Sequence, residues 1–90
     1  VALKREIGAA PKLEVNVIGK TVPEALPEVE AFLDQAVLSN LEEVKIIHGR
    51  GMKILSTAIH DMLRRDKRVE SFRFGKYGEG EHGVTFVKLK

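Results

Sequence analysis

The sequence predicts an α+β fold: a two-layer sandwich of order βαβαββ, in which two helices cover one face of a four-stranded mixed sheet. Segments with the two-residue period of strands alternate with two longer segments that have the period of helices. Right-handed crossovers place both helices on the same face. The last two strand segments are joined by a glycine-rich loop, so the last strand can return antiparallel to the first three.

The first strand is predicted over residues 13–18, which alternate in polarity and end at Gly19. Its odd-numbered residues are apolar and are expected to face the helices. Glu14, Asn16 and Ile18 are therefore expected to project from the open face of the sheet.

The first helix is predicted to begin at Thr21, which starts a capping-box sequence that ends at Glu24. Pro23 is tolerated in a first turn, whereas Pro27 removes one backbone hydrogen bond. Either the first turn is irregular, or the regular helix begins a few residues later. The apolar helical spacing continues to residues 39–40.

The remaining elements are apolar segments separated by turns. The second strand is predicted over 44–48, the second helix over about 53–65, the third strand over 69–74 and the fourth over 84–89. Residues 1–12 carry charge, Gly8 and Pro11 without apolar periodicity. We interpret residues 1–12 as a linker or the end of a preceding region, and residues 13–90 as one domain.

The composition is that of one small domain with a mild basic excess. Its 90 residues include 15 lysines and arginines and 13 aspartates and glutamates, which gives a net charge of +2. The absence of cysteine excludes disulfides, thiolate chemistry and a zinc site built from cysteines. No apolar run approaches the roughly 20 residues of a membrane span. We therefore expect a soluble, cytoplasmic protein with no membrane partner.

The most informative segment is His48-Gly49-Arg50-Gly51, between the second strand and the second helix. Glycine allows a tight turn and close approach to a ligand, and the N–H groups at the start of a helix attract anions. Arg50 adds a bidentate phosphate donor, and Lys53 adds a second positive charge. The segment predicts a phosphate site; a turn that needs glycine only for its geometry is the alternative.

His48 is the best acid–base candidate, because imidazole titrates near neutral pH and this residue ends a strand beside the predicted phosphate site. Alternatively, it packs beneath the second helix with its ring N–H satisfied, since Val44 and Ile46 share its strand face. His60 is expected on the surface of the second helix. Three aromatic residues with strand spacing are expected in the core: Phe72, Phe74 and Phe86.

Two further groups are candidate nucleic-acid contacts. In the loop 75–83, Lys76 or His82 could meet the phosphate backbone and Tyr77 could stack on a base. A basic run ends the second helix, where its charge complements the helix dipole or contacts phosphates: Arg64, Arg65, Lys67 and Arg68. Glu14, Glu79 and Glu81 could hold a divalent cation, but scattered surface carboxylates usually bind nothing, and we assign no metal ligand.

Three segments, in this order, resemble the motifs of the Smr (small MutS-related) domain: residues 15–19, 48–51 and 80–87. The resemblance implies a fold similar to the C-terminal domain of bacterial translation initiation factor three, and nicking endonuclease activity on DNA or RNA. In bacteria such a domain typically ends a MutS paralogue that restrains recombination and has been linked to collided ribosomes. The implied partners are DNA or RNA, the ribosome, and ATPase domains of the same full-length chain.

The first motif departs from the family pattern, which usually has an acidic residue at Asn16 and His or Arg at Ile18. Glu14 lies on the same strand face and could supply the missing carboxylate. We assign His48 as the acid or base, and Glu14 with Asn16 as the groups that orient the attacking water. The assigned nucleic-acid contacts are Gly49, Arg50, Gly51, Lys53, Lys76, His82, Arg64 and Arg65.

Three functions follow from these assignments. The first is a nucleic-acid-binding domain with structure-tolerant nicking activity, involved in suppression of homologous recombination. The second is a noncatalytic module that docks on RNA, a ribosome or branched DNA, which the departures at Asn16 and Ile18 favour. The third is a structural interaction domain. No cofactor is assigned with certainty; the candidate is a divalent cation, magnesium or manganese.

Overall fold

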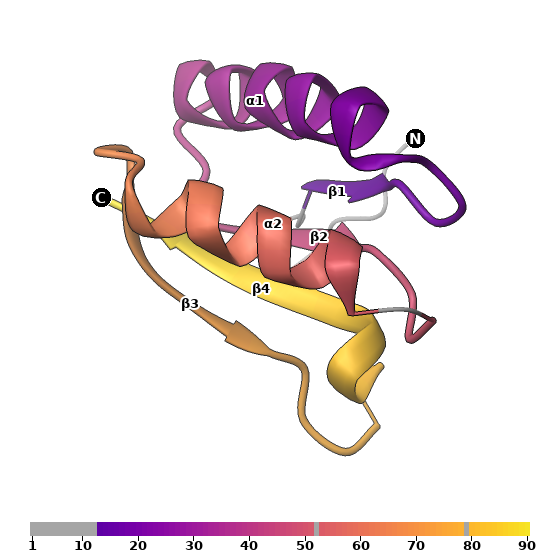
Figure 1. The fold of residues 1–90 in the computed structure, drawn as a ribbon. Helices are drawn as coiled ribbons and strands as arrows, with labels where there is room; N and C mark the ends of the chain where they lie inside the picture. The colour runs from indigo at the N-terminus through magenta and orange to yellow at the C-terminus, as the bar shows by residue number, and fades with distance from the viewer. Residues whose placement is uncertain (1–12, 52, 79) are drawn as a thin grey trace, which may run out of the picture.

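A computed structural model describes residues 13–51, 53–78 and 80–90 (Figure 1). The predicted linker 1–12 lies outside the described residues, as do Met52 and Glu79. The predicted α+β order βαβαββ is confirmed, with a short 3₁₀ turn, η2, before the last strand. The elements are β1 (Leu13–Asn16), α1 (Val22–Leu38), β2 (Glu43–Ile47), α2 (Ile54–Arg64), β3 (Val69–Phe74), η2 (Glu81–Gly83) and β4 (Val84–Leu89).

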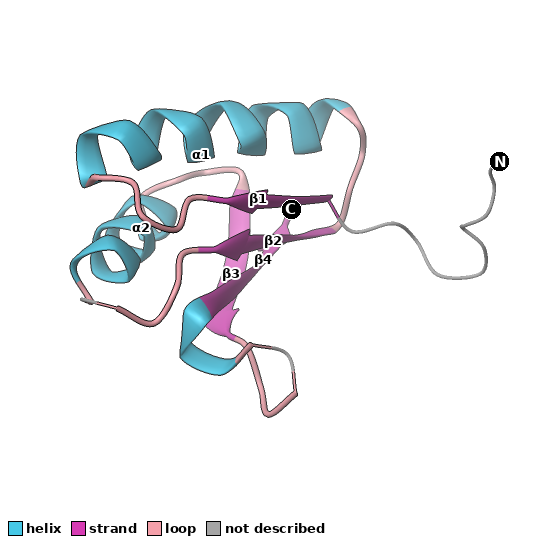
Figure 2. Cartoon of the chain, turned by 90° about the vertical axis from the view of Figure 1, so that its right-hand side faces the viewer, coloured by secondary structure: helices cyan, strands magenta, loops and turns pink. Residues whose placement is uncertain are grey.

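The four strands form one mixed sheet in the order β1-β2-β4-β3. β1 and β2 are parallel, and β4 is antiparallel to both β2 and β3. The first three strands therefore run in the same direction, as predicted, and the last strand in the sequence lies between β2 and β3. Both helices cover one side of the sheet, which leaves the opposite face open (Figure 2).

β1 is shorter than predicted because the chain turns immediately after Asn16. The side-chain Oδ1 of Asn16 accepts a hydrogen bond from the backbone N–H of Ile18 at 2.9 Å. Such a turn is the conformation that asparagine favours, and it takes Ile18 out of the strand. β2 ends at Ile47, one residue earlier than predicted, so His48 lies after the strand and is not its last residue.

α1 begins at Val22, and the helix continues through Pro27. The Oε1 atom of Glu24 accepts the N–H of Thr21 at 2.9 Å, as the capping sequence predicts. Neither alternative for Pro27, an irregular first turn or a later start, describes the helix. Both Pro23 and Pro27 are exposed, so water can satisfy the carbonyl that loses its hydrogen bond to Pro27.

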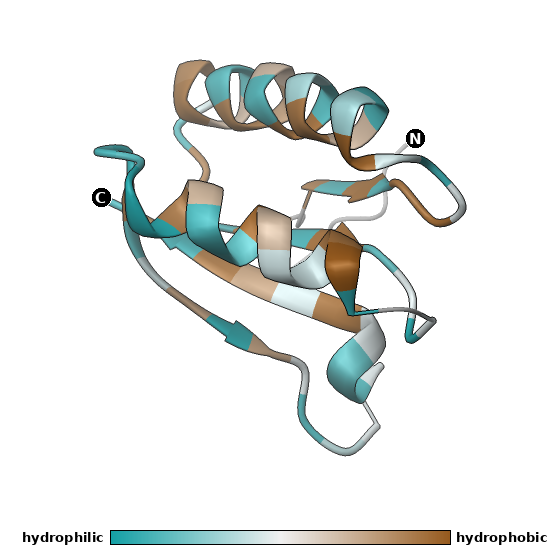
Figure 3. Cartoon of the chain, viewed as in Figure 1, coloured by the Kyte–Doolittle hydropathy of each residue, from teal (hydrophilic) through white to brown (hydrophobic). Residues whose placement is uncertain are grey.

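The core lies between the helices and the sheet, and the apolar side of α1 faces it (Figure 3). Phe72 packs against this core. Phe86 is buried, as predicted, but outside the cluster between the helices and the sheet. β4 alternates its side chains between the faces, and Phe86 lies on the open face, where Arg73 covers its ring at 4.7 Å and Lys45 at 5.9 Å. Among the described residues, neither helix is long and apolar enough to cross a membrane.

Candidate phosphate-binding site

Two glycine-rich segments that are distant in the sequence meet at one end of the sheet. The carbonyl of Gly83 accepts the backbone N–H groups of His48 and Gly49 at 3.1 and 2.9 Å. A Cβ atom at Gly83 would lie 3.2 Å from Cγ of Arg50, so only glycine fits this close approach without displacing the arginine. The N–H of Gly49, a predicted nucleic-acid contact, is therefore used within the protein.

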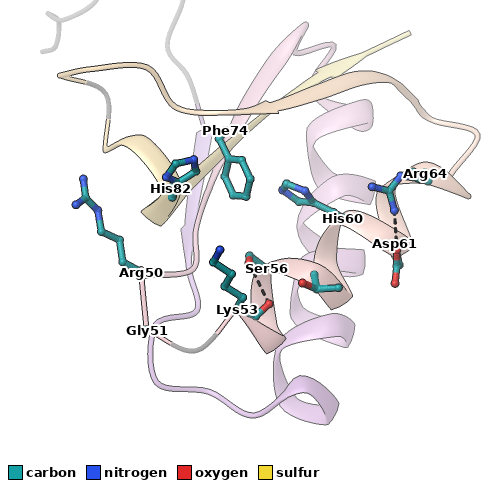
Figure 4. Close-up of a pocket in the computed structure, with 11 residues that line it drawn as sticks. Arg50, Gly51, Lys53, Ser56, His60, Asp61, Arg64, Phe74 and His82 are labelled. Carbon is teal, nitrogen blue, oxygen red and sulfur yellow. Dashed lines mark hydrogen bonds and ion pairs between the residues drawn. The ribbon is translucent and has the colours of Figure 1, made fainter.

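A pocket of about 300 Å³ opens beside this junction, between α2 and the end of β3 (Figure 4). Its charged and titratable lining residues are Arg50, Lys53, His60, Asp61, Arg64 and His82. They come from the turn after β2, from α2 and from the turn before β4. The structure thus brings six of the eight predicted nucleic-acid contacts to this pocket: Gly49, Arg50, Gly51, Lys53, Arg64 and His82.

The pocket carries an excess of positive charge. Arg50 pairs with Glu81 at 2.9 Å and Arg64 with Asp61 at 2.6 Å, and both arginine side chains are more than half exposed. Within the described part of the chain, the first turn of α2 contains no acidic residue, and Lys53 provides no side-chain cap. The positive end of the α2 dipole therefore meets Arg50 and Lys53 without a compensating carboxylate in that turn, whereas Arg64 lies in the last turn of the helix.

His60, which lines the pocket, belongs to a hydrogen-bond network with two buried residues, Thr85 and His48. The hydroxyl Oγ1 of Thr85, which is fully buried, lies 2.7 Å from Nε2 of His48 and 2.7 Å from Nε2 of His60. Nδ1 of His48 lies 3.1 Å from the carbonyl oxygen of Gly49. Burial lowers the pKa of both imidazoles, and their mutual repulsion lowers that of His60 further. Both rings are therefore neutral at pH 7.

His60 is not a surface residue, contrary to the prediction. Its ring packs against Phe72 and Phe74, with both centroid distances 4.7 Å. Residue 60 follows the buried Ile59 on the flank of α2, and β3, the edge strand, extends beneath that flank. The apolar period of α2 could be seen in the sequence. That β3 lies beneath this flank of the helix could be known only from the order of the strands in the sheet.

The predicted catalytic trio is not brought together. Glu14 and Asn16 pair in register with Lys45 and Ile47 and are exposed on the open face of the sheet. His48 is 5% exposed, bonds to Thr85 and lies on the helix-covered side. A water oriented by Glu14 or Asn16 therefore does not lie beside the His48 ring, and the packed alternative describes the position of His48.

The remaining predicted contacts lie elsewhere. Lys76 is exposed in the loop after β3 and does not line the pocket. Arg65 lines a separate hollow with Arg68 and Lys67, and Arg68 is held by three carboxylates: Glu30, Asp34 and Asp66. The basic run is therefore not one patch: Arg64, the last residue of α2, lines the pocket, whereas Arg65, Lys67 and Arg68 follow the helix and line the separate hollow.

A metal held by protein ligands alone does not fit the described residues, which contain no group of three His, Cys, Asp or Glu side chains placed to bind one. Glu81 pairs with Arg50, and Glu14 lies on the other face of the sheet. Glu14 and Glu81 are therefore apart. Glu79, the third predicted carboxylate, lies outside the described residues.

Comparisons with known proteins show what the chain and its fold are similar to. The family model of the Smr domain matches residues 15–90. The Endonuclease MutS2 proteins of Lachnoclostridium phytofermentans and Acetivibrio thermocellus are each 52% identical over 77 residues, which cover 86% of this chain but 10% of those proteins. The chain therefore spans about a tenth of the length of these relatives.

Two solved structures share the fold. The Smr domain of Thermus thermophilus MutS2 superposes with a TM-score of 0.85 at 49% identity, covering 87% of this chain and 98% of that one. YdaL from Escherichia coli, a stand-alone small MutS-related protein, superposes with a TM-score of 0.83 at 26% identity, covering 92% of this chain and 69% of that one.

Proposed function

This chain belongs to the Smr domain family, and from that premise we propose that it binds the phosphodiester backbone of nucleic acid in the pocket beside α2. The observation that carries the proposal is the convergence of three cations on one pocket: Arg50 and Lys53 at the start of α2, and Arg64 in its last turn. Such cations and a helix N-terminus both favour phosphate oxygens. Glu81 and Asp61 hold two of these cations until a phosphate displaces them.

We extend the proposal to cleavage of one strand of the bound nucleic acid. The relatives at 52% identity are named endonucleases, although that name belongs to proteins about ten times as long as the matched segment. As part of a longer MutS-related protein, the domain would act in the cytoplasm on recombining DNA or on ribosomal RNA, beside ATPase domains of the same chain. Magnesium or manganese is the cofactor to test, but no step of the proposal runs through a metal ion.

Salt-dependent binding tests the first half of the proposal. Labelled duplex DNA and single-stranded RNA are titrated with the domain between 50 and 200 mM salt, which are roughly the limits over which counterion release is resolved. Three phosphate contacts to duplex DNA predict that log affinity falls with log salt with a slope of about 3. Lys88→Ala is the matched control, because Lys88 is exposed on β4 and lies outside the pocket. A slope near zero contradicts the proposal. A smaller slope in Lys88→Ala than in the unmodified domain also contradicts it, because that residue lies outside the pocket.

Conversion of supercoiled plasmid to open circles tests the second half. The domain and its Asn16→Asp variant are compared in magnesium, in manganese and in EDTA. Nicking by the unmodified domain supports an endonuclease despite the departed first motif. Nicking only by the variant indicates that a carboxylate at residue 16 is required.

A noncatalytic docking module is the second candidate function. The observation that favours it is the separation of Glu14 and Asn16 from His48 by the sheet. Saturable binding without cleavage in every buffer would select this module over the endonuclease.

A further inference from the structure

Two histidines line the pocket on either side of Phe74 (Figure 4). The ring centroids of His60 and His82 lie 4.7 and 4.8 Å from that of Phe74. We propose that His60 and His82 carry the proton transfers of phosphodiester cleavage in this pocket, and that Thr85 and His48 hold His60 in the required tautomer. This inference rests on the proposed function and deepens it by naming the groups that act on the substrate.

The hydrogen-bond network determines the tautomer of His60. A carbonyl oxygen only accepts, so Nδ1 of His48 donates to Gly49, and Nε2 of this neutral ring must accept. The hydroxyl of Thr85 therefore donates to Nε2 of His48. Its oxygen then accepts the Nε2–H of His60. Nδ1 of His60 remains without a proton and is the basic nitrogen of a ring that lines the pocket.

The surroundings of His60 favour the neutral ring in the empty pocket. Its neighbours are Phe72 and Phe74 from β3, Thr85 from β4, His48 after β2, and Asp61 and Arg64 from its own helix. Burial, His48 and Arg64 lower its pKa, and Asp61 partly offsets them. A neutral imidazole is a base, and the negative charge of a phosphate beside it favours taking up a proton.

The proposed reaction needs no metal ion. The oxygen of water, or of a neighbouring 2′-hydroxyl in RNA, forms a bond to phosphorus, and its proton passes to Nδ1 of His60. The bond from phosphorus to the leaving sugar oxygen breaks, and that oxygen takes a proton from the imidazolium of His82. Arg50 and Lys53 stabilise the charge on the phosphoryl oxygens. Solvent then removes the proton from His60 and returns one to His82.

Cleavage in EDTA by His60→Gln and His82→Gln tests this assignment on supercoiled plasmid and on single-stranded RNA. A glutamine amide can keep the bond of residue 60 to Thr85 but cannot act as a base. We expect each variant to lose cleavage by about 100-fold or more, while binding changes less than about threefold. The control is Lys88→Gln, with both activities unchanged. Cleavage of plasmid identifies water as the nucleophile, because DNA has no 2′-hydroxyl, and a 2′,3′-cyclic phosphate on cleaved RNA identifies the 2′-hydroxyl.

Thr85 and His48 are positioning residues, so their test needs a readout other than rate. Nitrogen-15 NMR of the imidazoles in the free domain is expected to show His60 protonated at Nε2 and His48 at Nδ1. The acidic limb of the pH–rate profile, which reports protonation of the base, is expected to shift in Thr85→Val and to return in Thr85→Ser. If Thr85→Val does not fold, the tautomers measured in the unmodified domain still test whether His60 is held with its proton on Nε2.

Several outcomes overturn the inference and leave the proposed function standing. They are cleavage that requires magnesium or manganese, cleavage that survives in both histidine variants, and a His60 ring protonated at Nδ1 alone. Failure of the unmodified domain to bind either nucleic acid overturns the proposed function itself, together with the inference. Binding without cleavage in any buffer overturns the inference and selects the docking module.

Discussion

Arg68 and Arg50 show two different uses of the same side chain. The Arg68 guanidinium contacts Asp66 at 2.6 Å and Glu30 at 3.2 Å, and its side chain is 24% exposed. Arg50 pairs with Glu81 on the rim of the pocket, and its side chain is 62% exposed. The difference teaches that a basic cluster in the sequence is not a binding surface by itself. The carboxylates that the fold places around each arginine decide whether it stabilises the protein or is available to a ligand.

Removing Arg50 and Lys53, two of the three arginines and lysines that line the pocket, should produce the largest effect. We expect Arg50→Ala with Lys53→Ala to weaken nucleic-acid binding by about 100-fold, because each lost charge-assisted contact costs about 1.5 kcal/mol. The free energy of unfolding should change by less than about 0.5 kcal/mol, since both side chains are exposed. Fluorescence anisotropy and urea unfolding measure the two quantities. A loss below about threefold would place binding elsewhere.

Arg68→Ala should show the opposite pattern. We expect the free energy of unfolding to fall by about 2 kcal/mol, because the side chain of Asp66, 10% exposed, loses its charged partner. Nucleic-acid binding should remain within about twofold. Arg65→Ala is the stability control, since Arg65 is exposed and bonds to the backbone carbonyl of Asp61. Weakened binding in Arg68→Ala with unchanged stability would reverse the comparison.

Glu81→Gln tests whether the partner of Arg50 competes with the ligand. Removing this carboxylate frees the guanidinium without removing its charge, so we expect nucleic-acid affinity to rise by about fivefold at low salt. The gain should shrink as salt screens the original pair. Glu70→Gln is the matched control, because Glu70 pairs with Lys88, outside the pocket. An unchanged or weaker affinity would show that Glu81 orients Arg50 instead of competing.

Lowering the pH should reduce the free energy of unfolding through two groups of residues, each in its own pH range. The first group is His48 and His60 beside the pocket, where we expect the smallest effect, and the second is the Arg68–Asp66 pair. The pKa values of His48 and His60 are lowered from 6.5, so the unfolded chain binds more protons, and stability is lost as pH falls below 6.5. We expect the urea midpoint to fall progressively between pH 6.5 and pH 5. Arg68 lowers the pKa of Asp66 from 3.8, so its contribution is lost only below that pH. Urea midpoints that do not change between pH 7.5 and 5 would contradict the first part.

Local patterns predicted the fold well because each element carries its own period and turn signals. β3 and β4 begin and end where the sequence predicts, and the Thr21–Glu24 cap starts α1. The boundaries that moved, at Asn16 and His48, depend on one side-chain bond and on the pairing of β2 with β4. Arg50 and Lys53 were found because a glycine turn before a helix is a local signal.

The histidine network could not be predicted in the same way. Thr85 joins His48 to His60 across 37 and 25 residues of sequence, and these contacts exist only after β4 lies between β2 and β3. Phe86 is buried, as predicted, but its sequence did not reveal that it lies under Arg73 and Lys45 on the open face of the sheet. The face that each β4 residue occupies became known only with the strand order.

The position of β4 also determines when the site can form during synthesis. β4 is the last strand to leave the ribosome, yet it lies inside the sheet, where it joins β3 to β2 and supplies Thr85. A nascent chain that stops before residue 84 has β1 and β2 but lacks the strand that pairs β3 with them. Non-local pairing of this kind is slow and leaves strand edges exposed until it is complete. The pocket therefore forms only after β4 has left the ribosome, so a ribosome paused before that point holds a chain that cannot yet bind a phosphate there.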